Sequence, residues 1–383
     1  MLLSSVGMMG EVVALGWLAL TLTDSPFMVG VAMGARALPL FFLGVPAGAL
    51  ADRFSRRNLL MAAGVGQAAT AASMGLLALF GLASLGNLVA LTLAAGAFRG
   101  IEHAARQSYT HDVVGAASLV SGLAVLGVLM RAGWLVGSLG VGALIARWGT
   151  GPAYFAVAAS YLAGAAALLP AAAGAAREPA AGGSLWGSIV DFLGLVRRDR
   201  ALVVLMVLTA AAEVLGFSHQ ALLPSLARDV LHTGPEGLGA LNAARSVGGI
   251  VGLVAAMRGI AARGGAFFVG VLVFFGGSVG ALGLAPYMTG FAGVLLVLTA
   301  ANAAGALADL LAQSLLQLAV PAHLRGRAGG AWVVAIGLAP LGQLQIGALA
   351  SLFGVSVALA GSGLGLVGSA VLTALLFPRV RRL

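Results

Sequence analysis

The feature that most constrains this chain is a series of apolar runs that recur from its first residues to its last. An α-helix needs about 20 apolar residues to cross the hydrocarbon core of a membrane. Cutting the chain wherever such a run meets a charge or a turn rich in Gly or Pro predicts twelve spans. They are 2–22, 28–50, 59–80, 87–110, 117–146, 151–171, 201–224, 237–257, 265–285, 288–313, 328–352 and 355–377. Helices are predicted because the runs are continuous and lack the period-two alternation of a barrel wall.

The composition excludes a soluble globular fold. Hydrophobic residues make up 60% of the chain and charged residues only 9%, whereas charged residues are about a quarter of an ordinary soluble domain. The absence of cysteine excludes disulfides and thiolate metal sites. The sequence therefore predicts an all-α polytopic membrane protein.

The arginines predict the orientation in the membrane, because cytoplasmic loops carry an excess of positive charge. All 21 basic residues are arginine. With both termini cytoplasmic, fifteen arginines lie in cytoplasmic segments and only Arg147 and Arg228 lie on the opposite side. The net charge of +9 is then explained by topology and by contact with anionic lipids, and nucleic acid is not expected as a partner.

A long polar stretch divides the twelve spans into two sets of six. It begins as a Pro/Gly/Ala linker and continues, from Ser184, as an amphipathic segment of the kind that lies at a membrane interface. The expected division is a first half over 1–171, a cytoplasmic linker with an amphipathic helix over 172–200, and a second half over 201–383.

The rare charged residues within the spans repeat between the two halves at similar offsets of 202, 209 and 207 residues. The pairs are Glu11 with Glu213, Arg36 with Arg245, and Glu102 with Asp309. Similar offsets favour a duplicated unit of six helices with small insertions in its loops.

The loop "GALADRFSRRNLL" resembles the signature loop between helices two and three of the major facilitator superfamily. In that loop a Gly is followed four residues later by an acid and then by a basic cluster, although Ser55 stands where the family has Gly. The "ARQ" at 105–107 and "AVPAHLRGRAGG" at 319–330 extend the resemblance to the bacterial drug:proton antiporter branch that includes the enterobactin exporter. A second copy of the loop, "GLVAAMRGIAARGG" at 252–265, has no acid.

This resemblance implies twelve helices in two pseudo-symmetric six-helix bundles, and a conformational latch at the cytoplasmic side. The latch residues would be Gly48, Asp52, Arg53, Arg56 and Arg57. The alternative is that the arginines merely set topology. For Arg56 and Arg57 both interpretations stay open. Asp52 favours the latch, because an acid adds nothing to the excess of positive charge that sets topology.

The charges within spans are the candidates for function, because a charge at the bilayer centre costs about 2.5 to 3.5 kcal/mol. We expect Glu11, Glu213 and Asp309 to be candidates for proton coupling, since a carboxyl in a partly dry cavity can carry a proton between the two sides. The alternative is that Glu11 and Glu213 form ion pairs with Arg36 and Arg245 that only hold helices together. Asp309 is also typical of a structural partner of an arginine.

A further set of residues is predicted to line a substrate cavity. Arg36 and Arg245 would bind an anionic substrate or adjust the acids, and His219 has the alternative of an ordinary hydrogen-bonding role. The set is Trp17, Arg36, Arg99, Phe217, His219, Gln220, Arg245 and Asn302.

Together these features predict a secondary transporter that exports a small amphipathic molecule, such as a drug or siderophore, in exchange for protons. It would be a monomer in the bacterial cytoplasmic membrane, with no enzymatic activity, no cofactor and no metal. A "GxGxxG" pattern at 361–368 lies in an apolar helix with no strand before it, which argues against dinucleotide binding. The alternatives are a lipid or lysolipid flippase of the same fold and a non-transporting membrane sensor or scaffold.

Overall fold

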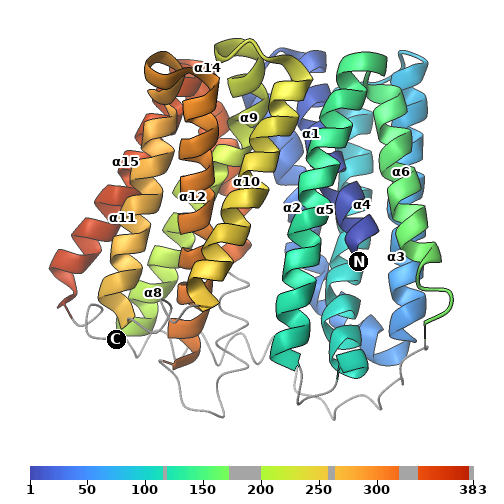
Figure 1. Ribbon diagram of the computed structural model, residues 1–383, viewed down its shortest axis with the longest axis horizontal. Coiled ribbons are helices and arrows are strands. Elements are labelled where there is room, and N and C mark those ends of the chain that lie inside the picture. The colour runs from blue at the N-terminus through green and yellow to red at the C-terminus, as the bar shows by residue number, and fades with distance from the viewer. Residues whose placement is uncertain (115–118, 172–199, 258–263, 319–334, 379–383) are drawn as a thin grey trace. The chain divides into compact units, whose positions relative to one another are not determined.

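The computed structural model describes residues 1–114, 119–171, 200–257, 264–318 and 335–378, and within these ranges the chain is helical with no strand (Figure 1). The first half contributes six long helices. They are α1 (Leu2–Thr23), α2 (Pro26–Arg53), α3 (Arg56–Leu79), α4 (Leu85–Val114), α5 (Leu119–Trp148) and α6 (Thr150–Ala166).

The second half contributes five further long helices and one span that is divided into short pieces. The long helices are α10 (Gly234–Met257), α11 (Gly264–Leu282), α12 (Ala285–Leu318), α14 (Ala339–Phe353) and α15 (Val355–Leu376). The divided span consists of α8 (Arg200–Ala211), η2 (Ala212–Gly216), η3 (Phe217–Leu222), α9 (Leu223–Ser225) and η4 (Leu226–Val230).

Each predicted span corresponds to a helical segment of the described residues, so the prediction of an all-α polytopic fold is confirmed. Eight of these segments are long and apolar enough to cross a membrane by length and composition alone. The boundaries differ in places. The tenth span begins three residues earlier than predicted, and Gly290 interrupts it with a backbone φ of 62°. The eleventh is described only from residue 335 onward.

The seventh span is not the single helix that its apolar run predicts. Its backbone widens to a π-helical turn in η2 and tightens to a 3₁₀-helix in η3. The ring Nδ1 of His219 lies 2.7 Å from the carbonyl oxygen of Gly216 and donates to it. Pro224 follows, and it has no backbone N–H with which to donate a hydrogen bond within the helix. A side chain that binds the backbone and a missing donor both favour departure from regular α-helix, and π-turns often mark functional sites.

The chain forms two compact units. The first comprises Met1–Gly182 and His232–Ala243, and the second comprises Gly183–Leu231 and Ala244–Leu383. The predicted division at residues 171 and 201 stays a prediction, since the linker lies outside the described residues up to 199.

In the first unit, α1 packs against α5 and α6, while α3 packs against α4 and α6, and α2 against α4. Glycines permit this closeness. A Cβ on Gly133 would lie 2.6 Å from the carbonyl oxygen of Leu2, and one on Gly137 would overlap the carbonyl of Val6. The two glycines are four residues apart, on one face of α5, as is typical of close helix pairs in lipid.

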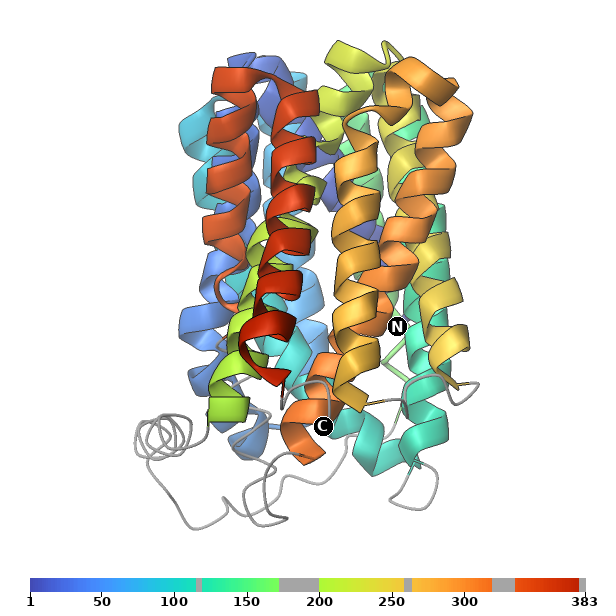
Figure 2. The ribbon, with the colours of Figure 1, turned by 90° about the vertical axis from the view of Figure 1, so that its left-hand side faces the viewer.

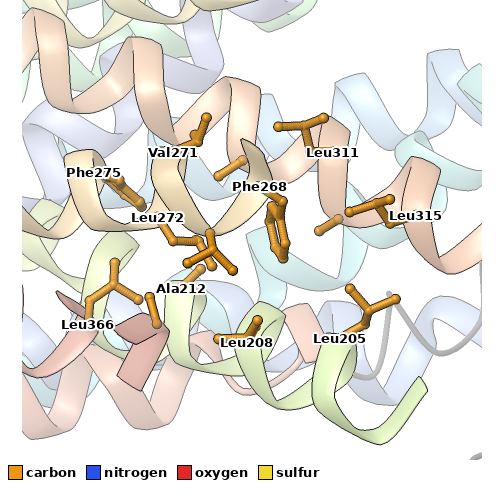
Figure 3. Close-up of a cluster of buried hydrophobic side chains, with 14 of the residues drawn as sticks. Leu205, Leu208, Ala212, Phe268, Val271, Leu272, Phe275, Leu311, Leu315 and Leu366 are labelled. Atoms are coloured by element: carbon orange, nitrogen blue, oxygen red, sulfur yellow. The ribbon is translucent and has the colours of Figure 1, made fainter. Parts of the chain in front are cut away.

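In the second unit, α11 runs between α12 and α15, as the orange and red helices in Figure 2 show. Its core is built from the facing sides of α8, α11, α12 and α15 (Figure 3). Phe268, Leu272 and Phe275 of α11 are fully buried there. This core fixes the position of η2, which follows α8 directly.

Candidate functional site

Glu11 is the centre of a buried polar cluster in the first unit. Only 6% of the residue is exposed. Its Oε1 lies 3.3 Å from Nη2 of Arg99 on α4 and 3.9 Å from Nε of Arg36 on α2. Its Oε2 accepts a hydrogen bond of 2.6 Å from the hydroxyl of Tyr161 on α6. One carboxylate of α1 therefore joins three other helices of the unit.

Small residues let these helices come close enough for the cluster to form. A Cβ on Gly96, three residues before Arg99, would lie 2.9 Å from the carbonyl oxygen of Arg36, so α4 and α2 meet backbone to backbone. A Cβ on Gly7, one turn before Glu11, would lie 3.2 Å from the ring of Tyr161. Larger side chains at these positions would push the arginine and tyrosine away from the carboxylate.

The cluster carries more positive than negative charge. Two guanidinium groups share one carboxylate, and Arg36 also donates from Nη2 to the carbonyl of Met8 at 3.4 Å. Within the described residues, the buried Nε of Arg36 and the buried Nε and Nη1 of Arg99 have no hydrogen-bond acceptor. Because unpaired charge is expensive in an apolar interior, the carboxylate of Glu11 is the group on which the balance of the cluster depends.

The structure thus brings Glu11 together with Arg36, the ion-pair partner that the sequence offered as an alternative, and adds Arg99, which was predicted only as a cavity residue. Tyr161 was missed. The only signal in the sequence was its spacing of seven residues from Tyr154, which places both tyrosines on one face of α6, and both are buried. Trp17 is half-buried and lies six residues beyond Glu11. Six residues correspond to about 600° around the axis of α1, which is one full turn plus about 240°, so Trp17 lies on a different face from the carboxylate.

A second buried polar group lies between α3 and α4 of the same unit. Nε2 of Gln67 donates to Oε2 of Glu102 at 2.9 Å, and Nη1 of Arg106 donates to Oε1 at 3.3 Å. Nη2 of Arg106 also lies 3.5 Å from Nδ1 of His103. Glu102 was noted in the sequence only as part of the internal repeat, and the structure adds it to the candidate site.

In the second unit, Glu213 lies in the π-helical turn η2 and is 9% exposed. Its carboxyl is close enough to that of Asp309 on α12 for the two charges to interact. The predicted pairing of Glu213 with Arg245 is not among the ion pairs that the described residues make. The equivalent positions of the two halves therefore have different surroundings, positive around Glu11 and negative beside Glu213.

His219 and Asn302 belong to the interior of the second unit. His219 is 0% exposed. With Nδ1 donating to Gly216, its Nε2 accepts from Nδ2 of Asn302 at 3.4 Å. Asn302 also donates to the carbonyl of Leu298 at 3.0 Å. These contacts match the ordinary hydrogen-bonding role that the sequence left open for His219.

Phe217 packs in the same interior, with its ring centroid 5.0 Å from that of Phe275. Gln220 is half-buried, and half-buried Arg245 on α10 interacts electrostatically with His219. A role of these three residues in a substrate cavity stays a prediction.

The expected latch is described only in part. The side chains of Gly48, Asp52 and Arg53 lie outside the described residues, although α2 continues through all three positions and ends at Arg53. Arg56 is buried at the start of α3. Nη1 of Arg57 donates to the carbonyl of Ala171 at 2.9 Å, within the first unit. The latch stays a prediction.

Comparison with known proteins agrees with this architecture. The sequence profile of the transmembrane secretion effector family matches residues 1–382. No curated protein matches the chain. Among solved structures, a variant of the peptide transporter POT in complex with alafosfalin is 13% identical with a TM-score of 0.80, covering 100% of this chain and 93% of that one.

Two other transporters have similar structures at similarly low sequence identity. A variant of the nucleoside transporter NupG is 13% identical with a TM-score of 0.78, covering 99% of this chain and 97% of that chain. A bacterial homolog of the human lysosomal transporter Spinster, inward-facing and unoccupied, is 14% identical with a TM-score of 0.65, covering 100% and 96%. At these identities the likeness concerns the fold, which is twelve helices in two six-helix bundles. The chain belongs to the transmembrane secretion effector family, and it is a secondary transporter of the major facilitator type.

Proposed function

We propose that this protein exports a small amphipathic molecule in exchange for protons, by alternating access between its two halves, and that Glu11 carries the proton. The proposal places it as a monomer in the bacterial cytoplasmic membrane with both termini in the cytoplasm. The family description, which concerns secretion, supports export. The motif resemblance supports the drug:proton antiporter branch.

The observation that carries the proton role is the buried carboxylate of Glu11 between Arg99, Arg36 and Tyr161. Protonation would remove the negative charge that two guanidinium groups share, so these contacts would exist in one protonation state and weaken in the other. A ligand shifts a conformational equilibrium only through such differential interaction. Because the cluster joins α1, α2, α4 and α6, a change in its charge acts on the packing of a whole unit.

The test is proton movement in inside-out vesicles that contain the protein, followed with a pH-gradient dye. Lipophilic cations, antibiotics and siderophores are added in turn. We expect at least one compound to collapse the gradient in the wild type, and Glu11→Gln to abolish this response. Glu11→Asp, which keeps the charge, should retain part of it. Glu236→Gln, at an exposed position in the first turn of α10, is the matched control and should behave as the wild type.

Two results would contradict the proposal. A Glu11→Gln variant that is inserted and folded and still collapses the gradient would reduce Glu11 to a structural ion pair. Substrate movement that needs no proton gradient, in particular lipid movement between leaflets, would favour the flippase alternative.

A further inference from the structure

A small cavity lies in the first unit between α1, α3, α4 and α6, and polar side chains share its walls with the apolar residues Leu60, Ala165 and Leu168. Its lining includes Ser4, Gly64, Gln67, Glu102, Tyr161 and Gly164. Tyr161 is therefore shared between two sites, because its hydroxyl is bonded to Glu11. Glu102 lines the cavity directly, and Glu11 is linked to it through Tyr161.

Gln67 indicates what this cavity accommodates. Only 1% of Gln67 is exposed. Its Nε2 donates to Glu102, and this bond fixes the amide orientation, because a flipped amide would place its oxygen against a carboxylate oxygen. Its Oε1 is buried and has no hydrogen-bond partner among the described residues. A buried unpaired acceptor costs about 1–3 kcal/mol, so an unpaired acceptor beside Glu102 in the wall of this cavity favours an ordered water.

We propose that Glu102 is a second proton site, and that a water in this cavity and the hydroxyl of Tyr161 relay protons between Glu102 and Glu11. This inference rests on the proposed proton role of Glu11 and assigns the route by which that carboxylate is loaded.

The transfer balances along the chain of groups. Protonated Glu102 gives its proton to the cavity water, and the water passes a proton to the phenolic oxygen of Tyr161. Tyr161 gives its own hydroxyl proton to Oε2 of Glu11 along the existing 2.6 Å hydrogen bond. Glu102 is left as a carboxylate and Glu11 becomes a carboxylic acid, while Tyr161 and the water are unchanged.

The charged surroundings of both ends come from several helices. Glu102 is faced by Arg106 and His103 of its own helix, by Gln67 of α3, and by the α-amino group of Met1. Arg106 balances the ionised form of Glu102 after it has released its proton. Around Glu11 the charged groups are Arg99 and Arg36, with Tyr161 as the hydrogen-bond donor.

An apolar cluster adjoins the cavity through Leu60, which belongs to both. The cluster consists of the buried residues Leu60, Ala105 and Tyr109, with Leu59 and Leu168 packed against them. Such a wall limits free access of water, so a proton reaching Glu11 from this side needs side-chain carriers. Glu102 is the titratable carboxyl that lines the cavity.

The experiment separates the rate of protonation of Glu11 from its equilibrium. The purified full chain in lipid nanodiscs is given a rapid pH jump, and the carboxylic-acid band in the infrared is followed with time. The component of this band that is absent from the Glu11→Gln variant is assigned to the carboxylic acid of Glu11. We expect Glu102→Gln to slow the appearance of that band by about a hundredfold, the lower end of what a positioned proton-transfer group contributes. The final amplitude should change little, since Glu102 does not contact Glu11.

Two further variants keep the test decisive if Glu102→Gln folds poorly. Gln67→Leu removes the polar wall of the cavity without removing a charge and should slow the same band. Tyr161→Phe should also slow it, whereas Tyr154→Phe, which removes another buried hydroxyl on α6, should not. Wild-type rates in Glu102→Gln, Gln67→Leu and Tyr161→Phe would overturn the relay and leave the proton role of Glu11 intact. No Glu11 band at any pH would instead overturn the proposed function, and the relay with it.

Discussion

Removing the shared carboxylate of Glu11 should destabilise the protein more than removing either arginine that contacts it. Glu11→Gln leaves the mostly buried side chains of Arg36 and Arg99 without the carboxylate that they share, and removing one partner of a buried pair costs about 3–5 kcal/mol. Arg99→Gln leaves Glu11 its contacts with Arg36 and Tyr161. Its cost should be that of one hydrogen bond to a charged group, about 1.5–3 kcal/mol.

The double variant tests the reasoning further. In Glu11→Gln/Arg99→Gln the second substitution removes one of the two stranded cations, so the total loss should fall short of the sum of the single losses. Coupling of residues in contact amounts to about 0.5–3 kcal/mol. The assay is the free energy of unfolding in mixed micelles with increasing SDS, followed by circular dichroism.

An exposed ion pair provides the control. Nε of Arg228 lies 2.6 Å from Oδ1 of Asp229, closer than either arginine lies to Glu11, but the two side chains are 28% and 36% exposed. Arg228→Gln should therefore cost about 1 kcal/mol or less. A loss in Arg99→Gln as large as in Glu11→Gln, or strictly additive losses, would refute the idea that one carboxylate balances two cations.

Two packing predictions follow from the same reasoning about burial. Gly137→Val should destabilise the first unit by about 1–3 kcal/mol or more, because the added atoms meet the carbonyl of Val6. Gly140→Val, with open space around its Cβ, should be near neutral in the same SDS titration. Equal losses of unfolding free energy in the two variants would contradict the contact. Phe275→Ala should cost about 3–5 kcal/mol because Phe275 is fully buried. Phe274→Ala should cost far less, because Phe274 is 58% exposed. A similar loss at both phenylalanines would show that the core is misplaced.

The sequence predicted the helices well because a membrane allows few alternatives. Without water to satisfy the backbone, an apolar run of span length must be helical, and this places most of the helices in the described ranges to within a few residues. The same rule does not reveal a break such as η2 and η3, because π-turns, 3₁₀-turns and α-helix all satisfy most of their backbone groups internally. The sequence alone suggests that Glu213 and His219 lie on one regular α-helix. Only the structure shows that a π-turn and a 3₁₀-helix change the directions of their side chains.

The candidate site was predictable to the extent that its members carry charge. Glu11, Arg36 and Arg99 were recognisable because a charge in an apolar span needs a reason. Tyr161 carries no charge, and its spacing from Tyr154 alone does not separate it from a packing residue. The contact between Glu102 and Gln67, and the cavity that they share with Tyr161, come only from the structure.

The internal repeat places Glu11 and Glu213 at equivalent positions, and equivalence in sequence favours equal roles. The structure argues against this equality. Glu11 is surrounded by two arginines and a hydroxyl donor, so its negative charge stabilises contacts with three other helices. Glu213 lies near another acid, Asp309 on α12. Protonation of Glu11 would weaken existing ion pairs, whereas protonation of Glu213 would remove one of two like charges. Positions that the repeat makes equivalent in sequence thus differ in what a proton would do there, because their charged neighbours differ.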